Sequence, residues 1–442
     1  MFKTDLYTIA AQGGTPVKVP LGHLRQVFGA WSHDGTRLWY FTSSTQDGAA
    51  LEGVASARSD GGDERQVVAE NEVAFGDGIL ADMKETGRGC GPLLDAQDRW
   101  FVADVSVPGG TALARFDATT GKQTVLAGGD REIAECSMSE DGAKIAYVAT
   151  DATHPGEVYV LDVAGGASTK VSGLNDSYVA SHALSGIERH TVKNSSGQPI
   201  EYWVMRPPQA SPGKRYPTIV DIHGGPQYEF GNSFFHEFQF WASRGYVVAF
   251  GNPRGSVGYG YQWSRDLEGN WGDPMFDDVM AITNEVAGRA DVDPQRLVVS
   301  GGSYGGYATL WIVGHTQRFK AAIAERVVSN LFTQLLGSDY GGSAPGQYSW
   351  GEPWTHRDVL WKQSPVAYVK NVRTPLLILH SDNDTRTPVD QTYEEFMALK
   401  SLARPVWLLE VPRDTHDLSR VGEPIHRVER LNLLADWLGK HV

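Results

Sequence analysis

The chain has 442 residues, 41% of them hydrophobic and 21% charged, a balance that excludes a disordered or fibrous protein and suits two large globular units. A formal net charge of −14 repels phosphate backbones, so we expect no nucleic acid among the partners. Only two cysteines occur, which excludes a disulfide framework and a cysteine-based metal site.

The N-terminal residues lack the apolar segment of a signal peptide. No uncharged apolar run anywhere in the chain approaches the roughly 18 residues that cross a bilayer. We therefore expect a soluble, cytoplasmic protein without a membrane partner.

Residues 1–182 carry short alternating runs of apolar and polar residues that end at Gly or Asp. An Asp-Gly turn phrase at residues 31–40 recurs at 137–147 and, more weakly, at 95–101, and its last two copies lie 43 residues apart. A strand-rich repeat of ~40–45 residues is typical of one propeller blade. We predict about three blades plus a leading strand, an incomplete all-β propeller, because closed propellers have about 4–8 blades. A β-sandwich with coincidental Asp-Gly turns is the alternative.

Residues 183–442 show a different pattern, in which strands and helices alternate. A turn cluster at 194–197 and the breaker Pro207-Pro208 precede it. Short unbroken apolar runs suit strands buried on both faces of a parallel sheet. They lie at residues 217–222, 246–250, 297–300, 321–324, 376–379 and 406–409. The fold class that we predict is α/β, with an α/β-hydrolase domain over 183–442.

Two helices are predicted with the greatest detail. Asp273-Pro274 has the pattern of a helix start, and an apolar stripe follows it at Phe276, Val279, Ile282 and Val286. The last segment of the chain carries a second apolar stripe at helical spacing. Its members are Val428, Leu431, Leu434 and Leu438.

The sharpest chemical signal is a Gly-x-Ser-x-Gly motif formed by Gly301, Ser303 and Gly305. An apolar strand leads into it and an apolar segment follows, which is the strand–turn–helix context of a nucleophile elbow. Such a turn is strained and needs small neighbours, and it lifts the Ser303 hydroxyl above the edge of the sheet. A glycine-rich turn with a capping serine is the alternative interpretation.

A nucleophilic serine needs a base, and the base needs an orienting acid. Asp384 follows the predicted strand 376–379, and His416 follows the strand 406–409, so both lie at carboxyl ends of strands, where α/β active sites form. We expect Ser303 as nucleophile, His416 as general base and Asp384 as the acid. Asp382 competes with Asp384 for that role.

Backbone N–H groups are expected to stabilise the oxyanion. Strand 217–222 ends in a His-Gly-Gly-Pro loop, which makes Gly225 one candidate donor, and Tyr304, directly after the elbow serine, is the other. His223 in that loop is expected to brace it rather than to react. An aromatic cluster between Phe230 and Trp241 is expected to form a buried helix face, with an apolar specificity pocket as the alternative.

Several phrases together resemble the prolyl oligopeptidase family of serine peptidases, most closely its acylaminoacyl-peptidase and dipeptidyl-peptidase-like branch. They lie at residues 223–226, 252–260, 301–306, 383–388 and 416–420. The resemblance implies a Ser303–Asp384–His416 triad with oxyanion donors at Gly225 and Tyr304, and it favours Asp384 over Asp382. It also places Arg386 near the substrate, where it contacts a carbonyl or carboxylate or, alternatively, forms a loop salt bridge.

Family members carry a longer N-terminal propeller that admits only short peptides. Here the blades begin part-way through a set, and their unpaired strand edges favour association, so we predict a homo-oligomer.

We expect hydrolysis of short peptides through an acyl-enzyme on Ser303, of acylaminoacyl-, dipeptidyl- or oligopeptidase type. A carboxylesterase or lipase with the same triad and a non-catalytic scaffold are the alternatives. We expect neither a cofactor nor a metal, because Phe240 replaces the second histidine of a zinc-binding helix motif that begins at His236.

Overall fold

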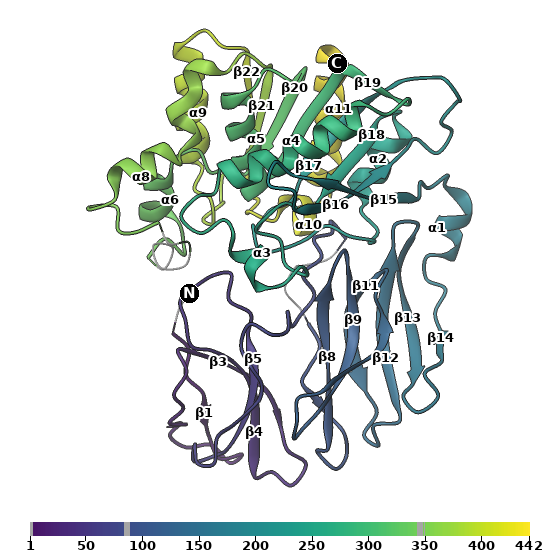
Figure 1. Cartoon of the computed structure of the whole chain (residues 1–442), viewed down its shortest axis with the longest axis vertical. Helices are drawn as coiled ribbons and strands as arrows, with labels where there is room; N and C mark the ends of the chain where they lie inside the picture. The colour runs from purple at the N-terminus through teal and green to yellow at the C-terminus, as the bar shows by residue number, and fades with distance from the viewer. Residues whose placement is uncertain (1–2, 84–88, 343–347, 349) are drawn as a thin grey trace.

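Three four-stranded antiparallel sheets, each built from consecutive strands, form the N-terminal part of the chain (Figure 1). The computed structural model describes residues 3–83, 89–342, 348 and 350–442. The sheets contain β3 (Arg25–Trp31), β4 (Arg37–Ser43), β5 (Gly53–Arg58) and β6 (Arg65–Val68); β7 (Leu93–Leu94), β8 (Trp100–Val107), β9 (Gly110–Asp117) and β10 (Gln123–Gly128); and β11 (Glu132–Met138), β12 (Lys144–Asp151), β13 (His154–Asp162) and β14 (Ser168–Lys170). A small pair, β1 (Tyr7–Thr8) with β2 (Val17–Lys18), precedes them. The predicted incomplete propeller is confirmed.

The recurring Asp-Gly phrase is the turn between the first and second strands of a blade. In the first blade the Ser32 hydroxyl donates to Asp34 Oδ1 at 2.7 Å. In the third blade the Ser139 hydroxyl donates to Asp141 Oδ1 at 2.6 Å. The carboxylate accepts from the turn in both places, so the same residue types recur at the same structural position.

The blades pack through their own apolar side chains and are also linked covalently. Phe101 and Phe116 are fully buried and stack with ring centroids 5.0 Å apart. A disulfide joins Cys90, just before β7, to Cys136 in β11 and so ties the second blade to the third. This single bond was not predicted from the two cysteines.

The C-terminal part contains an eight-stranded sheet. In sheet order the strands are β15 (Ile187–Lys193), β16 (Pro199–Met205), β18 (Val247–Gly251), β17 (Tyr216–Ile222), β19 (Val292–Gly302), β20 (Ala321–Glu325), β21 (Leu376–Ser381) and β22 (Val406–Val411). The pairs from β18 to β22 are parallel, whereas β15 and β16 form an antiparallel edge. All six predicted strands are present. The β15–β16 hairpin was missed, although its turn at 194–197 was identified.

Helices cover both faces of this sheet (Figure 1). The helices of the described residues are α1 (Asp176–Ser181), α2 (His236–Ser243), α3 (Tyr261–Arg265), α4 (Asp273–Ala287), α5 (Tyr304–His315), α6 (Leu331–Gly337), α8 (Arg357–Lys362), the 3₁₀ helix η1 (Pro365–Asn371), α9 (Asp390–Ser401), α10 (Leu418–Val421) and α11 (Pro424–His441). Val299 of β19 packs in the core with α4 and α5, while its neighbour Val298 packs with α2 and α11. Successive residues of one strand thus face opposite layers. Within the described residues, no helix is long and apolar enough to cross a membrane.

One residue of the apolar stripe predicted on the last helix is not buried, so its assignment is wrong. Leu431, Leu434 and Leu438 are buried, but Val428 is 61% exposed. At 3.6 residues per turn, position 428 is rotated well away from the direction of the three leucines. The charged residue Arg430 occupies the buried face instead.

The aromatic cluster forms a buried helix face, as predicted. Phe230, Phe238 and Trp241 lie in the core beneath α2. The predicted domain boundary after residue 182 falls between α1 and β15 and stays a prediction.

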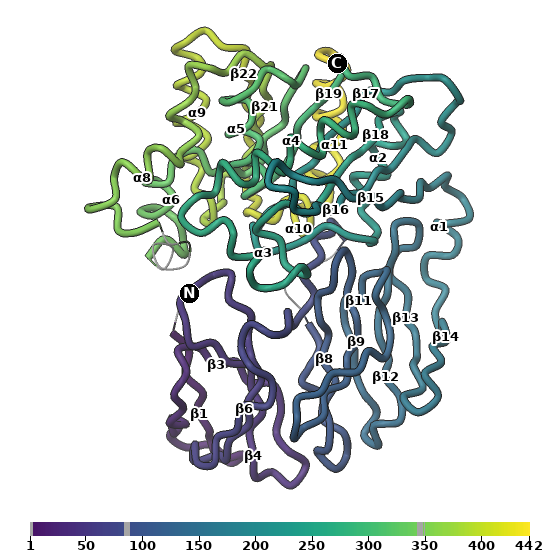
Figure 2. Tube along the Cα trace, in the orientation of Figure 1, coloured from purple at the N-terminus to yellow at the C-terminus, as the bar shows by residue number. Residues whose placement is uncertain are grey.

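The two parts of the chain lie one above the other, with the blades below the α/β part in the view of Figure 2. Buried polar contacts join them. The Asp82 carboxylate accepts hydrogen bonds from the backbone N–H groups of His236 and Glu237, at the start of α2. The Glu229 carboxylate accepts one from the Gly109 N–H at 3.0 Å.

Candidate active site

Ser303 lies between the end of β19 and the start of α5, in a backbone conformation that few side chains adopt. Its φ is +62° and its ψ is −120°. The flanking glycines are required by close packing: a Cβ at Gly301 would lie 2.6 Å from the Ile222 carbonyl oxygen, and one at Gly305 would overlap the same oxygen. Strand and helix therefore approach each other only because these two positions have no side chain.

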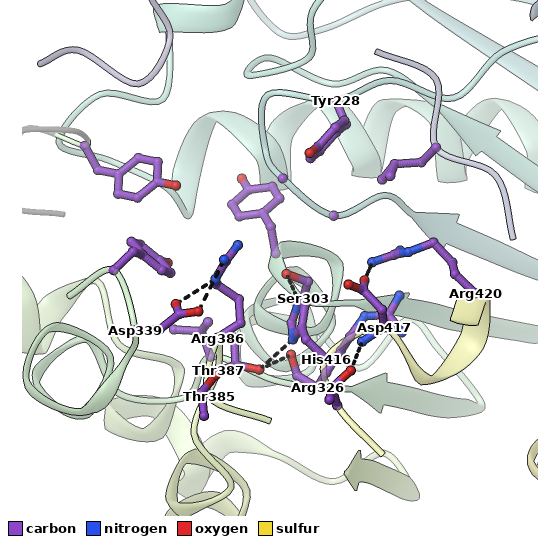
Figure 3. A pocket seen from close by; sticks show the side chains of 18 of the residues that line it. Tyr228, Ser303, Arg326, Asp339, Thr385, Arg386, Thr387, His416, Asp417 and Arg420 are labelled. Atoms are coloured by element: carbon purple, nitrogen blue, oxygen red, sulfur yellow. Dashed lines mark hydrogen bonds and ion pairs between the residues drawn. The ribbon is translucent and has the colours of Figure 1, made fainter. Parts of the chain in front are cut away.

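His416 and Asp384 extend a hydrogen-bonded line from this serine. His416 Nε2 lies 2.9 Å from Ser303 Oγ, and His416 Nδ1 lies 2.7 Å from Asp384 Oδ2. The two residues come from the loops after β22 and β21, as the sequence pattern indicated. Figure 3 shows the His416 ring directed at Ser303.

The structure separates the two candidate acids. Asp384 is buried, and its Oδ1 also accepts hydrogen bonds from the Arg386 and Thr387 backbone N–H groups, at 2.9 and 2.8 Å. Asp382 is exposed and its Oδ1 accepts from the Arg413 N–H at 2.6 Å instead. Of these two carboxylates, only Asp384 contacts His416.

The charges in this line suit proton transfer. Burial pushes the pKa of Asp384 upward, but hydrogen bonds with His380 and His416 outweigh it and hold the pKa well below its usual value, so the carboxylate is ionised. Burial lowers the pKa of His416, the Asp384 carboxylate opposes this, and the charges of Arg326 and Arg420 lower it further. The net shift is downward. The imidazole is therefore neutral near pH 7 and able to accept a proton.

The two candidate oxyanion donors border Ser303. A Cβ at Gly224 would lie 3.3 Å from Ser303 Cβ, so the loop that carries Gly225 lies against the serine. Tyr304 is the first residue of α5, where a backbone N–H has no partner within the helix. Within the described part of the chain, neither the Gly225 nor the Tyr304 backbone N–H donates a hydrogen bond.

His223 contacts the loop in the way expected of a brace. Its Nε2 lies 2.8 Å from Ser256 Oγ, and its Nδ1 lies 2.7 Å from the Gly224 carbonyl oxygen. Burial lowers the pKa of His223 to about 4, so the ring is neutral.

A cavity of about 630 Å³ opens above Ser303, and both parts of the chain line it. Arg386 stands on one side, bound to Asp339 through an Nε–Oδ1 contact of 2.8 Å and lying over the Tyr340 ring at 5.3 Å. The loop salt bridge that the sequence analysis offered as an alternative is thus present, and Arg386 lines the cavity as well. Figure 3 shows Asp417 and Arg420 on the opposite side of Ser303.

Five charged residues that line this cavity were not predicted from the sequence: Arg25, Arg326, Asp339, Asp417 and Arg420. Arg326 directly follows β20, and the carboxyl ends of parallel strands had already been the criterion for Asp384 and His416. Applied to every strand, the same criterion would have found it. No group of three or more His, Cys, Asp or Glu side chains within the described residues is placed to hold a metal ion.

Comparisons with known proteins show which family and which solved structures the chain resembles. Residues 232–442 match the model of the prolyl oligopeptidase family. An uncharacterized peptidase of Bacillus subtilis, YuxL, is 39% identical over 307 residues, which are 69% of this chain and 47% of that protein. Dipeptidyl-peptidase 5 of Porphyromonas gingivalis is 28% identical over 314 residues, 69% of this chain and 45% of that one. The chain spans about half the length of these curated relatives.

Solved structures share both parts of the fold. An acylaminoacyl peptidase in complex with Z-Gly-Gly-Phe-chloromethyl ketone superposes with a TM-score of 0.86 at 25% identity, covering 99% of this chain and 66% of that one. The uncomplexed acylaminoacyl peptidase of Pyrococcus horikoshii gives a TM-score of 0.84 at 25% identity and covers all of this chain and 67% of that one.

Proposed function

The chain belongs to the prolyl oligopeptidase family, and we propose that it is a serine peptidase that hydrolyses short peptides through an acyl-enzyme on Ser303. The observation that carries the proposal is the line of hydrogen bonds from Asp384 through His416 to Ser303 Oγ. Three residues 32 to 113 positions apart in the sequence meet there in the geometry that nucleophilic catalysis requires.

In the first half of the reaction, Ser303 Oγ attacks the carbonyl carbon of the scissile bond while His416 Nε2 takes the hydroxyl proton. The negative charge that develops on the carbonyl oxygen is stabilised by the Gly225 and Tyr304 N–H groups. His416 then gives its proton to the leaving amine, the C–N bond breaks, and the acyl group stays on Ser303. Asp384 holds the imidazole in place and stabilises its charged form.

In the second half, water replaces the amine. His416 takes a proton from the water, the hydroxide attacks the ester carbon, and the bond to Ser303 Oγ breaks as the serine regains its proton. The carboxylic acid product leaves, and each residue has returned to its starting state.

Short peptides are the proposed substrates because the cavity over Ser303 is bounded on its far side by the blades, through Thr4 and Arg25. Relatives and structural neighbours are named as peptidases, dipeptidyl-peptidases and acylaminoacyl peptidases.

The cytoplasmic location inferred from the sequence stays a prediction. Because disulfides are rare in the cytosol, the Cys90–Cys136 bond makes cell fractionation the direct test of that location.

The proposal is tested by labelling with a fluorophosphonate and by cleavage of an N-acetyl-dipeptidyl anilide and a nitrophenyl ester. We expect one adduct, on Ser303, and cleavage of the anilide. Ser303→Ala should remove the adduct and lower kcat by about 10⁴- to 10⁶-fold. Ser243→Ala, on the exposed side of α2, is the matched control and should change neither. Ester cleavage without any anilide cleavage would favour an esterase, and absence of an adduct would favour a binding scaffold.

A further inference from the structure

Two arginines share the flank of the cavity that lies across Ser303 from Arg386. Arg326 follows β20 and Arg420 lies in α10, and both line the cavity. The Arg420 side chain is only 12% exposed. In each guanidinium the Nε–H is buried and has no hydrogen-bond partner among the residues that the structure describes. A buried cation with unused donors is costly, so this flank is built to receive acceptors.

Of the charged side chains that line this flank, two are cations and one is an anion, while Glu325 behind them is bound by Arg430. Arg420 pairs with Asp417, whose side chain is 43% exposed. Arg326 Nη1 donates to the neutral Ser419 hydroxyl at 3.0 Å. Burial and the nearby charge of Arg420 lower the pKa of Arg326 to about 10, which still leaves it charged at neutral pH. Arg326, Asp417 and Arg420 together therefore carry a charge of about +1.

The Arg326 side chain is also held in a defined position. Its backbone has a φ of +40°, and its N–H donates to the Leu379 carbonyl oxygen at 2.8 Å. A Cβ at Gly302 would lie 2.7 Å from the Arg326 Cζ, so the guanidinium lies flat against the residue that precedes Ser303. Only a glycine at 302 permits this approach, which fixes a positive group next to the reacting serine.

We propose that Arg326 and Arg420 bind a carboxylate on the leaving-group part of the substrate. This inference rests on the proposed peptidase function and specifies its substrate class. His416 must hand its proton to the leaving amine. Asp417 and Arg420 come directly after His416 in the chain, in the loop and in the first turn of α10, so we place the leaving group on their side. The opposite flank, with Tyr340 and Tyr348 beside Arg386, suits the acyl part.

A carboxylate beside the scissile bond comes from one of two sources, either the free C-terminus of a very short peptide or an Asp or Glu side chain. A planar guanidinium binds both in the same way, through paired N–H donors. The preferred substrate thus carries a negative charge within one or two residues after the cleaved bond.

Three N-acetylated peptides that differ only at the residue after the cleaved bond test the inference. The first ends in a free carboxylate one residue after the cleaved bond, the second ends there in a carboxamide, and the third replaces that residue by Glu with a carboxamide end. We expect kcat/KM for at least one charged peptide to exceed that of the neutral peptide by about tenfold to a hundredfold. The charged peptide whose kcat/KM is raised identifies the source of the carboxylate, a free C-terminus or a side chain.

The gain should depend on the two arginines. Arg420→Gln should reduce the charged-to-neutral ratio of kcat/KM at least severalfold, and Arg420→Lys, which keeps the charge, should retain part of it. Arg326→Gln should act in the same direction. Arg65→Gln, an exposed arginine in the first blade, is the matched control and should leave the ratio unchanged. Equal kcat/KM for all three peptides in the wild type, or a ratio unaltered in Arg420→Gln, would overturn the carboxylate site.

These results are distinct from failure of the peptidase proposal. Cleavage of all three peptides at equal rates would support the peptidase proposal and contradict the carboxylate site. No cleavage of any peptide, together with no fluorophosphonate adduct on Ser303, would contradict both the peptidase proposal and the carboxylate site.

Discussion

The neutral state of His416 is set by a small number of charged neighbours. Asp384 favours the protonated imidazole, whereas burial, Arg326 and Arg420 favour the neutral one and prevail. The residue acts as a base only while it is neutral, so activity requires a pH above its pKa.

The acid limb of the pH profile follows from this balance. Since the pKa of His416 lies below the ordinary value of about 6.5, kcat/KM should fall only when the pH drops below that value. Arg420→Gln removes one of the charges that lower the pKa, so the midpoint should move to higher pH. Profiles of log kcat/KM for the carboxamide peptide measure both midpoints, and a shift to lower pH in the variant would contradict the assignment.

Backbone strain is concentrated at two residues of the site, Ser303 and Arg326, both with positive φ. Both directly follow the regular part of a neighbouring parallel strand, and both rely on a glycine whose missing Cβ makes room. Such conformations persist only when the surrounding structure enforces them. The strained residues are those to which we assign nucleophilic attack and carboxylate binding.

At the level of elements, α11 is tied to the sheet by a buried ion network. Arg430 binds Glu237 of α2 at 2.9 Å and also Glu325 at the end of β20, and all three side chains are at least 90% buried. Burial alone would lower the pKa of Arg430, but the two carboxylates outweigh it and raise the pKa well above the usual value. The helix is therefore held by charge as well as by its leucines.

Removing the arginine should be costly because two carboxylates would remain buried without their cation. We expect Arg430→Met to lower the free energy of unfolding by about 3–5 kcal/mol, measured by urea denaturation. Lys440→Met, on the exposed side of the same helix, is the matched control and should change it by less than about 0.5 kcal/mol. A loss in Arg430→Met no greater than in the control would contradict the network's role.

Much of the architecture was predictable at this scale because its signals are local. Unbroken apolar runs identified six strands, and the Gly-x-Ser-x-Gly motif located the elbow between β19 and α5. Val428 was assigned to the wrong face, and the burial of Arg430 was not predicted, because apolar spacing carries no information about a buried ion pair. Arg420 and Asp417 were missed because this flank of the cavity is assembled from segments that are distant in the sequence, and only the folded structure brings them together with Arg326.

At the level of the whole molecule, the blades are positioned by contacts with the α/β part that sequence patterns do not reveal. Asp82 lies in the segment between the first and second blades, yet its carboxylate binds the first N–H groups of α2. Tyr261 of α3 reaches the first blade through a 2.7 Å hydrogen bond from its hydroxyl to Asp47 Oδ2. These contacts hold the blades over Ser303, which is the basis for proposing short substrates.

Self-association remains a prediction at the same scale. The described blades form an open set whose outer strands have one unpaired edge each, and such edges favour pairing with another chain. We expect a mass of at least two chains by light scattering at micromolar concentration. A monomer throughout that range would contradict it.

The central claim is that Asp384, rather than Asp382, orients His416, which activates Ser303. Asp384→Asn and Asp382→Asn make the same chemical change in one loop. A difference in kcat between the two variants, measured with an N-acetyl-dipeptidyl anilide, therefore reflects the position of the lost carboxylate alone. The account predicts a loss of about 10⁴-fold for Asp384→Asn and near wild-type turnover for Asp382→Asn. Equal turnover in the two variants, or a larger loss in Asp382→Asn, would contradict it.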